Sequence, residues 1–392
     1  MQDLTIGLFG FGVVGEGIYR VLEEKPQLKA KIKKIVIKDK DKPRNAPSEL
    51  FSTNPDEILE DEEINVVVEL ISDADAAYTI IKKAFEKKKH VVSANKKLIA
   101  DYHNELLELQ KTHDVSFLYE ASVCGSVPII RNLEEYFDND LLNYVSGIVN
   151  GTTNYILTKM ANENESYENA LKAAQENGFA EADPTADVEG YDAAHKLSII
   201  TLHAFGVKIN TKDIVRKGIT SLKVNDFNYA REKGYTIKLI ANSKIIQESG
   251  EINSTVLPTF VKLDKTIALV NNKYNGVLIG SSLSDEQFLY GKGAGRYPTS
   301  SAVLSDISAL QYDYKYVIRK KSEDDIKCNQ SGFVRVYLGY DQPNDEFTQF
   351  FDEIEERYQS YTYNHIIGKV SLLKLKDEQL INNNNISLIV FE

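Results

Sequence analysis

The sequence predicts an α/β protein with a doubly wound parallel sheet at its N-terminus, an α+β region after it and a small α+β appendage. Up to about residue 133, apolar strand-like runs alternate with helical patterns, which is typical of a parallel sheet covered by helices. From residue 134 the pattern changes to helices and paired strand-like runs, and short strands return beyond a polar stretch at 320–332. We therefore expect domains at residues 1–133, 134–320 and 332–392, with the helix near 299–318 as a candidate to pack back on the first.

The composition is that of a globular protein without a strongly basic surface. The chain has 392 residues, of which 42% are hydrophobic, and a formal net charge of -12. This charge argues against nucleic acid or an anionic membrane as the main partner. The longest apolar runs are too short to span a bilayer, and the N-terminus lacks a signal-peptide pattern. With only Cys124 and Cys328 there is no disulfide framework or metal–thiolate spacing, which favours a cytoplasmic protein.

A glycine pattern, G-x-G-x-x-G, lies between the first predicted strand and the first predicted helix. Gly10 permits a tight turn, Gly12 lets the backbone approach a pyrophosphate, and Gly15 allows close packing of helix against strand. This context favours a Rossmann-type dinucleotide site; the alternative is a glycine-rich turn without a ligand. The residues that we expect at the cofactor are Gly10, Phe11, Gly12, Val13, Val14 and Gly15.

The end of the second strand is where such a fold selects its dinucleotide. An acid there binds the ribose 2′-hydroxyl of NAD, whereas basic residues accommodate the 2′-phosphate of NADP. The segment KDKDKPR, which begins at Lys38 and ends at Arg44, carries both kinds of charge. It leans towards NADP or towards the use of both cofactors, with Lys38 as a contact. A solvated run of charges is the alternative interpretation.

Polar residues also follow the later strands of the predicted parallel sheet. The apolar run from Ile64 to Ser72 fits a buried strand, and the next strand pattern, HVVSANKKLIA, contains Lys96. A further strand leads to Glu120 and a turn of small residues. Because ligands bind at the carboxyl ends of parallel strands, Lys96 is a candidate site residue, whereas Lys97 is interpreted as solvated.

The stretch from Gly178 to Lys196, GFAEADPTADVEGYDAAHK, concentrates titratable side chains in the second region. It carries five carboxylates and almost no large apolar side chain, so it does not build a core. Asp192 and Lys196 lie four residues apart in a helical pattern and therefore on one face. The helix that continues from Lys196 is apolar nearly all round and is predicted to be buried. A lysine at the mouth of a buried helix favours proton transfer, whereas the alternative is a solvated loop with a surface ion pair.

The remaining motifs are less specific. Asn150 to Asn154 form a turn with capping chemistry for a helix, and its backbone amides could hold an anion or simply start the helix. Residues from Ile219 to Gly295 predict a helix and strands of an antiparallel or mixed sheet. A glycine-rich loop at 291–295 lacks Walker spacing, so we expect it to contact a ligand seated elsewhere. In the appendage we expect a β-α-β-β order with a helix over EFTQFFDEIEERY.

Seven blocks of sequence resemble the homoserine dehydrogenase family, in the family's order and from residue 5 to about 310. GTTNYIL and ADPTADVEGYDAAHK are the most specific parts. The resemblance implies reversible NAD(P)-dependent interconversion of L-homoserine and L-aspartate 4-semialdehyde on the route to threonine, methionine and isoleucine, and it implies a homodimer. The blocks are GLFGFGVVGEG, VVVELIS, HVVSANKKLIA, YEASVCGSVPII, GIVNGTTNYILTKM, AEADPTADVEGYDAAHKL and GKGAGRYPTSSAVLSDI.

The resemblance also implies roles for individual side chains. Lys196 matches the family's catalytic lysine, which gives a proton to the aldehyde oxygen as hydride arrives at the carbon. Asp192 matches a homoserine-binding acid and would orient Lys196. Glu181 matches a second homoserine-binding acid, and Asp187 lies close by in the same motif. Lys96 matches a lysine near the nicotinamide and the substrate.

Cofactor and cation contacts follow from the same resemblance. Gly293 falls in the family's second cofactor-contacting loop, and Gly178 joins the cofactor-binding set. Glu120 matches a monovalent-cation site, with sodium as the expected ion. The backbone carbonyls that would complete this site belong to Val123, Gly125 and Val127.

The chain departs from the family pattern in three places. Ser72 and Asp73 stand where the family usually has a Gly pair, which affects contacts near the cofactor's adenosine. Cys124 and Ser126 occupy a turn that is commonly richer in glycine, which affects the cation site. Residues 333–392 resemble an ACT domain, which binds threonine in the family, but YDQPNDEF replaces the usual DxPG turn. An amino-acid effector at this appendage is therefore a hypothesis.

Two other functions stay open on the sequence. One is a dehydrogenase or reductase for another small amino-acid aldehyde, which the first domain permits and the blocks of the second half disfavour. The other is a catalytically inactive nucleotide sensor whose appendage binds an amino acid. The presence of Lys196, Asp192 and Glu181 argues against the sensor.

Overall fold

The computed structural model describes residues 3–138, 141–246, 249–320, 330–342 and 344–392. The chain divides into two compact units, one formed by Met1–Tyr136 with Lys292–Arg319 and the other by Phe137–Gly291 with Lys320–Glu392. Cys328 and most of the predicted linker at 320–332 lie outside the described residues. The predicted domain boundaries at 133, 134–320 and 332–392 stay a prediction.

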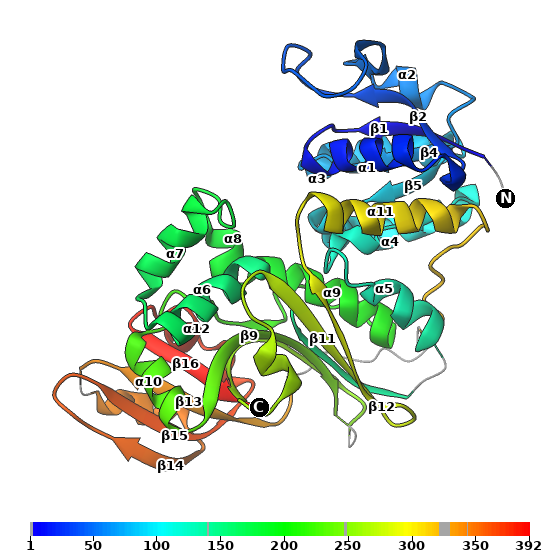
Figure 1. Ribbon diagram of the computed structural model, residues 1–392. Helices are drawn as coiled ribbons and strands as arrows, with labels where there is room; N and C mark the ends of the chain where they lie inside the picture. Colours follow the sequence, from blue (N-terminus) through cyan, green and yellow to red (C-terminus); the bar gives the residue numbers. More distant parts are fainter. Residues whose placement is uncertain (1–2, 139–140, 247–248, 321–329, 343) are drawn as a thin grey trace. The chain divides into compact units, whose positions relative to one another are not determined.

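The first unit contains a parallel sheet with the strand order β3-β2-β1-β4-β5-β6 (Figure 1). This is the order of a Rossmann-type doubly wound sheet, so the predicted fold class is confirmed. All four residues of the central strand β4 are buried, as expected for a strand covered on both faces. The strands are β1 (Leu4–Phe9), β2 (Ala30–Val36), β3 (Phe51–Ser52), β4 (Val66–Glu69), β5 (His90–Ser93) and β6 (Phe117–Leu118).

Two helices of the first unit begin at polar caps next to the strand ends. Asp73 caps α3 by accepting hydrogen bonds from the backbone N–H groups of Asp75 and Ala76. Asn95 caps α4 in the same way through Leu98, so the predicted strand at HVVSANKKLIA is a short strand followed by a helix. The helices are α1 (Val13–Glu24), α2 (Asp56–Leu59), α3 (Ala74–Glu86), α4 (Lys96–His113), α5 (Ile129–Arg131) and α11 (Arg296–Leu310).

Helix α11 belongs to the first unit although it is far from the other helices in sequence. It lies beside α1 (Figure 1), and Ser300 Oγ donates a hydrogen bond to the carbonyl of Val14 at 3.1 Å. A Cβ atom on Gly17 would lie 2.4 Å from Ser300 Oγ, so the two helices can approach this closely only because α1 has a glycine there. The packing places the loop before α11 in the same unit as the Gly10–Gly15 turn.

The second unit is built on a mixed sheet, as predicted. Its order is β12-β11-β7-β9-β10-β16-β13-β15-β14, and β8 also pairs with β10. Strand β10 pairs antiparallel with β9 and parallel with β16 and β8. The strands are β7 (Leu142–Ile148), β8 (Val215–Arg216), β9 (Tyr235–Ile245), β10 (Ile252–Lys262), β11 (Tyr274–Ser281), β12 (Asp285–Lys292), β13 (Phe333–Tyr340), β14 (Glu353–Tyr358), β15 (Asn364–Ser371) and β16 (Ile386–Phe391).

Helix α9 (Tyr191–Phe205) is the buried helix that the sequence predicted. Nearly every residue from Asp192 to Phe205 is buried, and the helix contacts β7, β9 and β10. It lies between two glycines with left-handed backbone, Gly190 with φ 77° and Gly206 with φ 71°. The other helices of this unit are α6 (Gly151–Glu163), α7 (Tyr167–Glu176), α8 (Thr185–Val188), α10 (Val224–Glu232) and α12 (Glu378–Ile381).

The helix predicted over EFTQFFDEIEERY is wrong. Asp345–Phe350 forms a short 3₁₀ helix, and Glu353–Tyr358 is the edge strand β14, which pairs antiparallel with β15. All six residues of β14 are exposed, so no burial pattern in the sequence marks it as a strand. Pairing with β15, supported by an ion pair between Glu353 and Lys369, prevails over the helix propensity of its glutamates. The ACT-like description of this segment stays a prediction.

A buried lysine ties the C-terminal segment to the rest of the second unit. Lys217 is 3% exposed and its Nζ donates to the backbone carbonyls of Leu380, Ile381 and Asn383, at the end of α12. Burial lowers the pKa of Lys217 to about 8. The ammonium thus satisfies carbonyl groups that the short helix leaves without an intrahelical partner.

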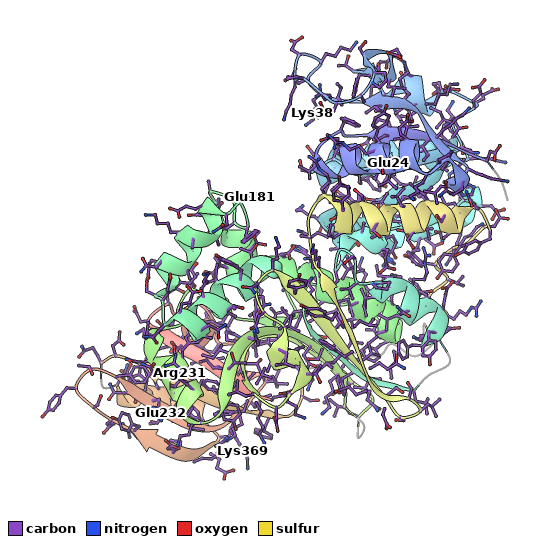
Figure 2. All side chains as sticks on the ribbon, viewed as in Figure 1. Glu24, Lys38, Glu181, Arg231, Glu232 and Lys369 are labelled. Atoms are coloured by element: carbon purple, nitrogen blue, oxygen red, sulfur yellow. The ribbon has the colours of Figure 1, made fainter. Side chains whose placement is uncertain are left out.

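We expect Lys217→Met to destabilise the second unit by about 2–4 kcal/mol, because one buried and two partly buried carbonyls lose a charged donor. Urea unfolding followed by tyrosine fluorescence measures the change. The matched control is Lys369→Met, which removes an exposed ion pair between β15 and β14 and should cost much less (Figure 2). Equal losses in the two variants would contradict a special role for Lys217.

Candidate active site

A buried ion pair lies near the start of helix α9. Lys196 Nζ lies 2.8 Å from Asp192 Oδ2 and donates a second hydrogen bond, also 2.8 Å long, to the carbonyl of Val149. Asp192 is 3% exposed and Lys196 is 9% exposed. The alternative of a solvated surface pair is therefore wrong for these two residues. Their mutual contacts hold the ammonium in one direction at the head of the helix.

Asn150 connects this pair to a second acid. Its Nδ2 donates to Asp187 Oδ1 at 2.7 Å and to Asp192 Oδ2 at 2.8 Å. Its Oδ1 accepts from the backbone N–H of Thr153 at 2.9 Å and so caps α6. The sequence predicted the cap but not the contact with the acids. Asp187, Asp192 and Lys196 are thus brought together, as the motif suggested.

Glu181 and Gly178 lie on the loop between α7 and α8, away from the buried core. Glu181 is exposed (Figure 2), and its backbone carbonyl accepts from Gln175 Nε2 at 3.1 Å. Gly178 has φ 69°, a left-handed conformation that favours glycine. The loop is attached to the start of α6, because Thr152 Oγ1 donates to the carbonyl of Phe179 at 2.7 Å.

The glycines of the first unit have the geometry that their spacing predicted. Gly10 has φ 94°, and a Cβ there would lie 3.0 Å from the carbonyl oxygen of Leu70. A Cβ on Gly15 would lie 2.7 Å from the carbonyl oxygen of Gly10, which explains the close packing of α1 on its strand. Gly12 has open space around it at the start of α1. A ligand can therefore approach the backbone at Gly12.

The other residues of this turn differ in exposure. Val13 is 59% exposed, whereas Val14 is half-buried. The Phe11 ring makes edge contacts with the rings of Tyr19 and Phe51. Phe11 therefore joins the turn to α1 and to the start of β3.

The charged segment after β2 is exposed except for Arg44, and the residue that follows it, Asn45, is held by an acid that the sequence analysis missed. Lys38 is exposed (Figure 2), and the Arg44 guanidinium lies 5.5 Å from the centre of the Phe51 ring. Glu16, inside the motif GVVGEG, accepts from Asn45 Nδ2 at 3.1 Å and pairs with Arg296 at 3.1 Å. These contacts lower the pKa of Glu16, with the Asn45 hydrogen bond as the largest cause. Glu16 thus links α1, the loop after β2 and the start of α11.

Glu69, another residue that the sequence analysis missed, lies at the carboxyl end of β4. It is fully buried and accepts from Ser93 Oγ at 2.6 Å and from the backbone N–H of Ile71 at 2.7 Å. Ser93 Oγ in turn accepts from the N–H of Asn95, the cap of α4, at 3.1 Å. Lys96 is the half-buried first residue of that helix. The sequence signal that could have identified Glu69 is that it is the single acid in the apolar run VVVEL.

The carboxylate of Glu120 joins the start of the loop expected to hold a cation to the residues that follow this loop. This buried side chain accepts from the backbone N–H groups of Ile130 at 2.9 Å and Arg131 at 2.8 Å. Burial raises the pKa of Glu120 to about 7. Asp306 on α11 supports the same loop, because it accepts from the N–H of Glu120 at 2.9 Å and pairs with Arg131 at 3.0 Å.

Two predicted contact loops meet in the first unit. Gly125 has φ 56°, and a Cβ there would lie 2.5 Å from the carbonyl oxygen of Gly293. The N–H of Ser126 donates to the carbonyl of Lys292 at 3.0 Å. Val123 and Val127 lie on the same turn and are buried. Within the described residues, no group of three or more His, Cys, Asp or Glu side chains is placed to hold a metal ion, but a site made of carbonyls is a different kind of site.

One further property concerns the helices. Across the parts of the chain that the structure describes, no helix combines the length and the apolar character that a bilayer crossing requires.

A doubly wound sheet with an open glycine turn, together with a buried lysine–carboxylate centre in a second unit, defines a dinucleotide-dependent oxidoreductase. Sequence profiles agree with this class: the profile described as "Homoserine dehydrogenase, NAD binding domain" matches residues 10–120, and the profile described as "Homoserine dehydrogenase" matches residues 128–308. The chain belongs to the homoserine dehydrogenase family. The resemblance found in the sequence is confirmed.

Individual relatives give the same result. The homoserine dehydrogenase of Bacillus subtilis (strain 168) is 36% identical over 359 residues, which cover 86% of this chain and 82% of the relative. That of Synechocystis sp. is 40% identical over 315 residues, or 78% of this chain and 73% of the relative. A solved homoserine dehydrogenase from Thiobacillus denitrificans has a TM-score of 0.88 at 29% identity and covers 100% of this chain and 98% of that chain. The enzyme of S. aureus at pH 6.5 gives a TM-score of 0.77 at 29% identity, with 100% and 99% covered.

The buried Glu69 predicts a pH dependence of stability. Burial raises the pKa of Glu69 to about 7. The free energy of unfolding that the protonated carboxyl contributes is therefore fully present below the ordinary carboxyl pKa, and it is lost as the pH rises through about 7. Between pH 5 and pH 8, the free energy of unfolding of the first unit should fall by about 2–3 kcal/mol more in the wild type than in Glu69→Gln. Urea titrations at the two pH values check this. The same pH dependence in both proteins would show that Glu69 is ionised throughout.

Proposed function

We propose that this protein catalyses the reversible NAD(P)-dependent interconversion of L-homoserine and L-aspartate 4-semialdehyde, on the route to threonine, methionine and isoleucine. The observation that carries the proposal is the buried contact of Lys196 with Asp192 at the head of α9, in a chain of this family. A dehydrogenase for another amino-acid aldehyde is disfavoured by the profile match over residues 128–308. An inactive sensor would have no need for a buried lysine–carboxylate centre.

The chemistry assigned to this centre is a proton transfer. When bound, the reduced dinucleotide supplies a hydride to the aldehyde carbon of L-aspartate 4-semialdehyde. The carbonyl oxygen then takes a proton from Lys196 Nζ, so that the alcohol forms and the lysine is left as an amine. Asp192 and the Val149 carbonyl keep the ammonium aimed in one direction. In the oxidative direction the amine takes the hydroxyl proton of homoserine as hydride leaves.

The acids are assigned to the substrate. Asp187 and Asp192 suit the ammonium of homoserine because both carboxylates lie at the same asparagine amide. Glu181, exposed on its loop, would complete the set when the substrate is bound. Lys96, at the start of α4, is assigned to the nicotinamide and substrate end of the first unit. The backbones of Gly178 and Gly293 are assigned to the cofactor with the turn from Gly10 to Gly15.

Replacement of Lys196 tests the reaction. Lys196→Met should lower kcat for homoserine oxidation by about 10²–10⁴-fold, because the positioned acid–base group is lost, while dinucleotide affinity stays unchanged. Initial rates with NAD and NADP, and with other hydroxy amino acids, measure this effect and the substrate range. Lys97→Met, which removes an exposed ion pair with Asp101, is the control and should keep full activity. A Lys196→Met enzyme that folds and keeps most of its turnover would refute the proton-transfer role.

For the cofactor, we propose that NADP is favoured over NAD. The support is the exposed Lys38 just beyond β2, with Arg44 nearby in the sequence and held against Phe51. Lys38→Ala should raise KM for NADP by about five- to tenfold through loss of a charge-assisted contact with the 2′-phosphate, and should leave KM for NAD unchanged. Steady-state kinetics with both cofactors decide the point. Equal changes for the two cofactors would contradict the assignment.

We also propose a sodium ion at the loop after β6. The carbonyl oxygens of Val123, Gly125 and Val127 are the kind of ligand that a hard cation prefers. Glu120 fits with them, because a carboxylate that accepts two N–H groups keeps further lone pairs, and a cation would lower its raised pKa. Bound there, the ion would supply fixed positive charge and rigidity to the loop against Gly293. Activity that is identical in sodium and in tetramethylammonium salts would argue against the site.

Three further proposals concern partners and location. A homodimer through the second unit is supported by large exposed side chains there, among them Leu263, Leu269 and Leu283, and sedimentation velocity tests it. An amino-acid effector such as threonine is supported by a pocket of about 750 Å³ in the C-terminal segment, whose lining includes Asp341 and Glu378; calorimetric titration tests it. A cytoplasmic location is supported by the low cysteine content, since the chain has only Cys124 and Cys328, and cell fractionation tests it.

A further inference from the structure

We infer that Asn150 is a positioning residue of the reaction centre: its amide holds Asp187 and Asp192 side by side as ionised carboxylates for the substrate ammonium, and fixes Asp192 against Lys196. The inference rests on the proposed function. Asn150 is 5% exposed and lies at the start of α6, one residue after Val149, whose carbonyl accepts from Lys196.

The contacts form a closed ring. Lys196 Nζ joins Asp192 Oδ2 and the Val149 carbonyl, both at 2.8 Å, and Asn150 Nδ2 joins the same Asp192 oxygen at 2.8 Å. Because Val149 and Asn150 are consecutive in the chain, the backbone closes the ring. The first turn of α9 is therefore fixed to the residues that precede α6. Neither Asp192 nor Lys196 can turn without breaking a bond to this segment.

The orientation of the amide follows from the helix. Oδ1 of Asn150 accepts from the N–H of Thr153 at 2.9 Å and lies 3.1 Å from its hydroxyl oxygen, so the NH₂ group must point to the acids. A serine, threonine or aspartate would cap the helix as well as asparagine does. Only asparagine at this position also supplies two donors, and both point to carboxylate oxygens. Helix capping alone therefore does not explain why this position is an asparagine.

The amide has a specific electrostatic effect. Two carboxylate oxygens that contact one nitrogen lie close together, and like charges at this distance oppose the ionisation of both. Hydrogen bonds from the amide have the opposite effect, because a donor favours the ionised form of the carboxylate that accepts from it. The charged groups in contact with this amide are Asp187 from α8 and Asp192 from α9, with Lys196 of α9 on the far side of Asp192. Thr153 of α6 adds no ionisable charge. A pair of adjacent negative charges is what the ammonium of an amino-acid substrate requires.

Two variants separate the contacts of Asn150 with the two acids from its capping of α6. Asn150→Ser keeps an oxygen to cap α6 but loses both donors, and Asn150→Asp keeps the size and the cap but turns an acceptor towards the two acids. We expect KM for homoserine to rise about tenfold in Asn150→Ser and about 100-fold in Asn150→Asp, with dinucleotide affinity unchanged. The acidic limb of the kcat/KM profile should move to higher pH in both, since the carboxylates lose donors that favoured their charged forms.

The control is Ser166→Ala, which removes the cap of the neighbouring helix α7, where the side chain accepts from the N–H of Asn169. This change should lower the thermal midpoint without moving the pH profile. Asn150→Ser with an unchanged KM and an unchanged acidic limb would overturn the inference, as would losses that follow stability alone. If the wild type does not oxidise homoserine, the proposed function fails by itself. In that case the NMR titration of labelled aspartate carboxyls decides the inference: higher pKa values at two aspartates in Asn150→Ser support it, and unchanged values reject it.

Discussion

The buried ion pair between Lys196 and Asp192 is the interaction on which the second unit depends. Removing two charges from water is costly, and their attraction compensates only when further hydrogen bonds satisfy them. Those bonds come from the Val149 carbonyl and from the amide of Asn150. The pair therefore requires the end of β7, the start of α6 and the start of α9 to lie together. The left-handed Gly190 lets the chain enter α9 at this point.

In the first unit, buried carboxyl groups likewise depend on hydrogen-bond donors around them. Glu69 and Glu120 are buried near the ends of parallel strands. Glu69 is held by donors from Ser93 of β5 and Ile71, and Glu120 by two N–H donors from α5. Burial raises the pKa of both to about 7. These acids order the loops on the edge of the sheet where ligands of doubly wound proteins bind. Their positions at the ends of apolar runs explain why they are buried, because strand and helix pack around them.

The C-terminal segment shows the limit of local patterns. Strand β14 is fully exposed at the edge of the sheet, so its side chains follow neither the alternation of a half-buried strand nor the stripe of an amphipathic helix. Its glutamates predicted a helix because they have high helix propensity. Backbone pairing with β15 decided the outcome, and that pairing depends on residues at the far side of a turn. Lys217 is similar, because its three carbonyl partners lie more than 160 residues away.

The sequence by itself determined the doubly wound sheet, the geometry of Gly10, Gly12 and Gly15, and the burial of α9, since spacing and apolar period act within a few residues. It also placed Asp192 and Lys196 on one face. Tertiary structure alone decided which acids meet the Asn150 amide: Asp187 and Asp192 gather there, whereas Glu181 stays exposed on its loop. The physical reason is that a side-chain contact across some 40 residues depends on how separate helices pack, and no local pattern encodes that packing.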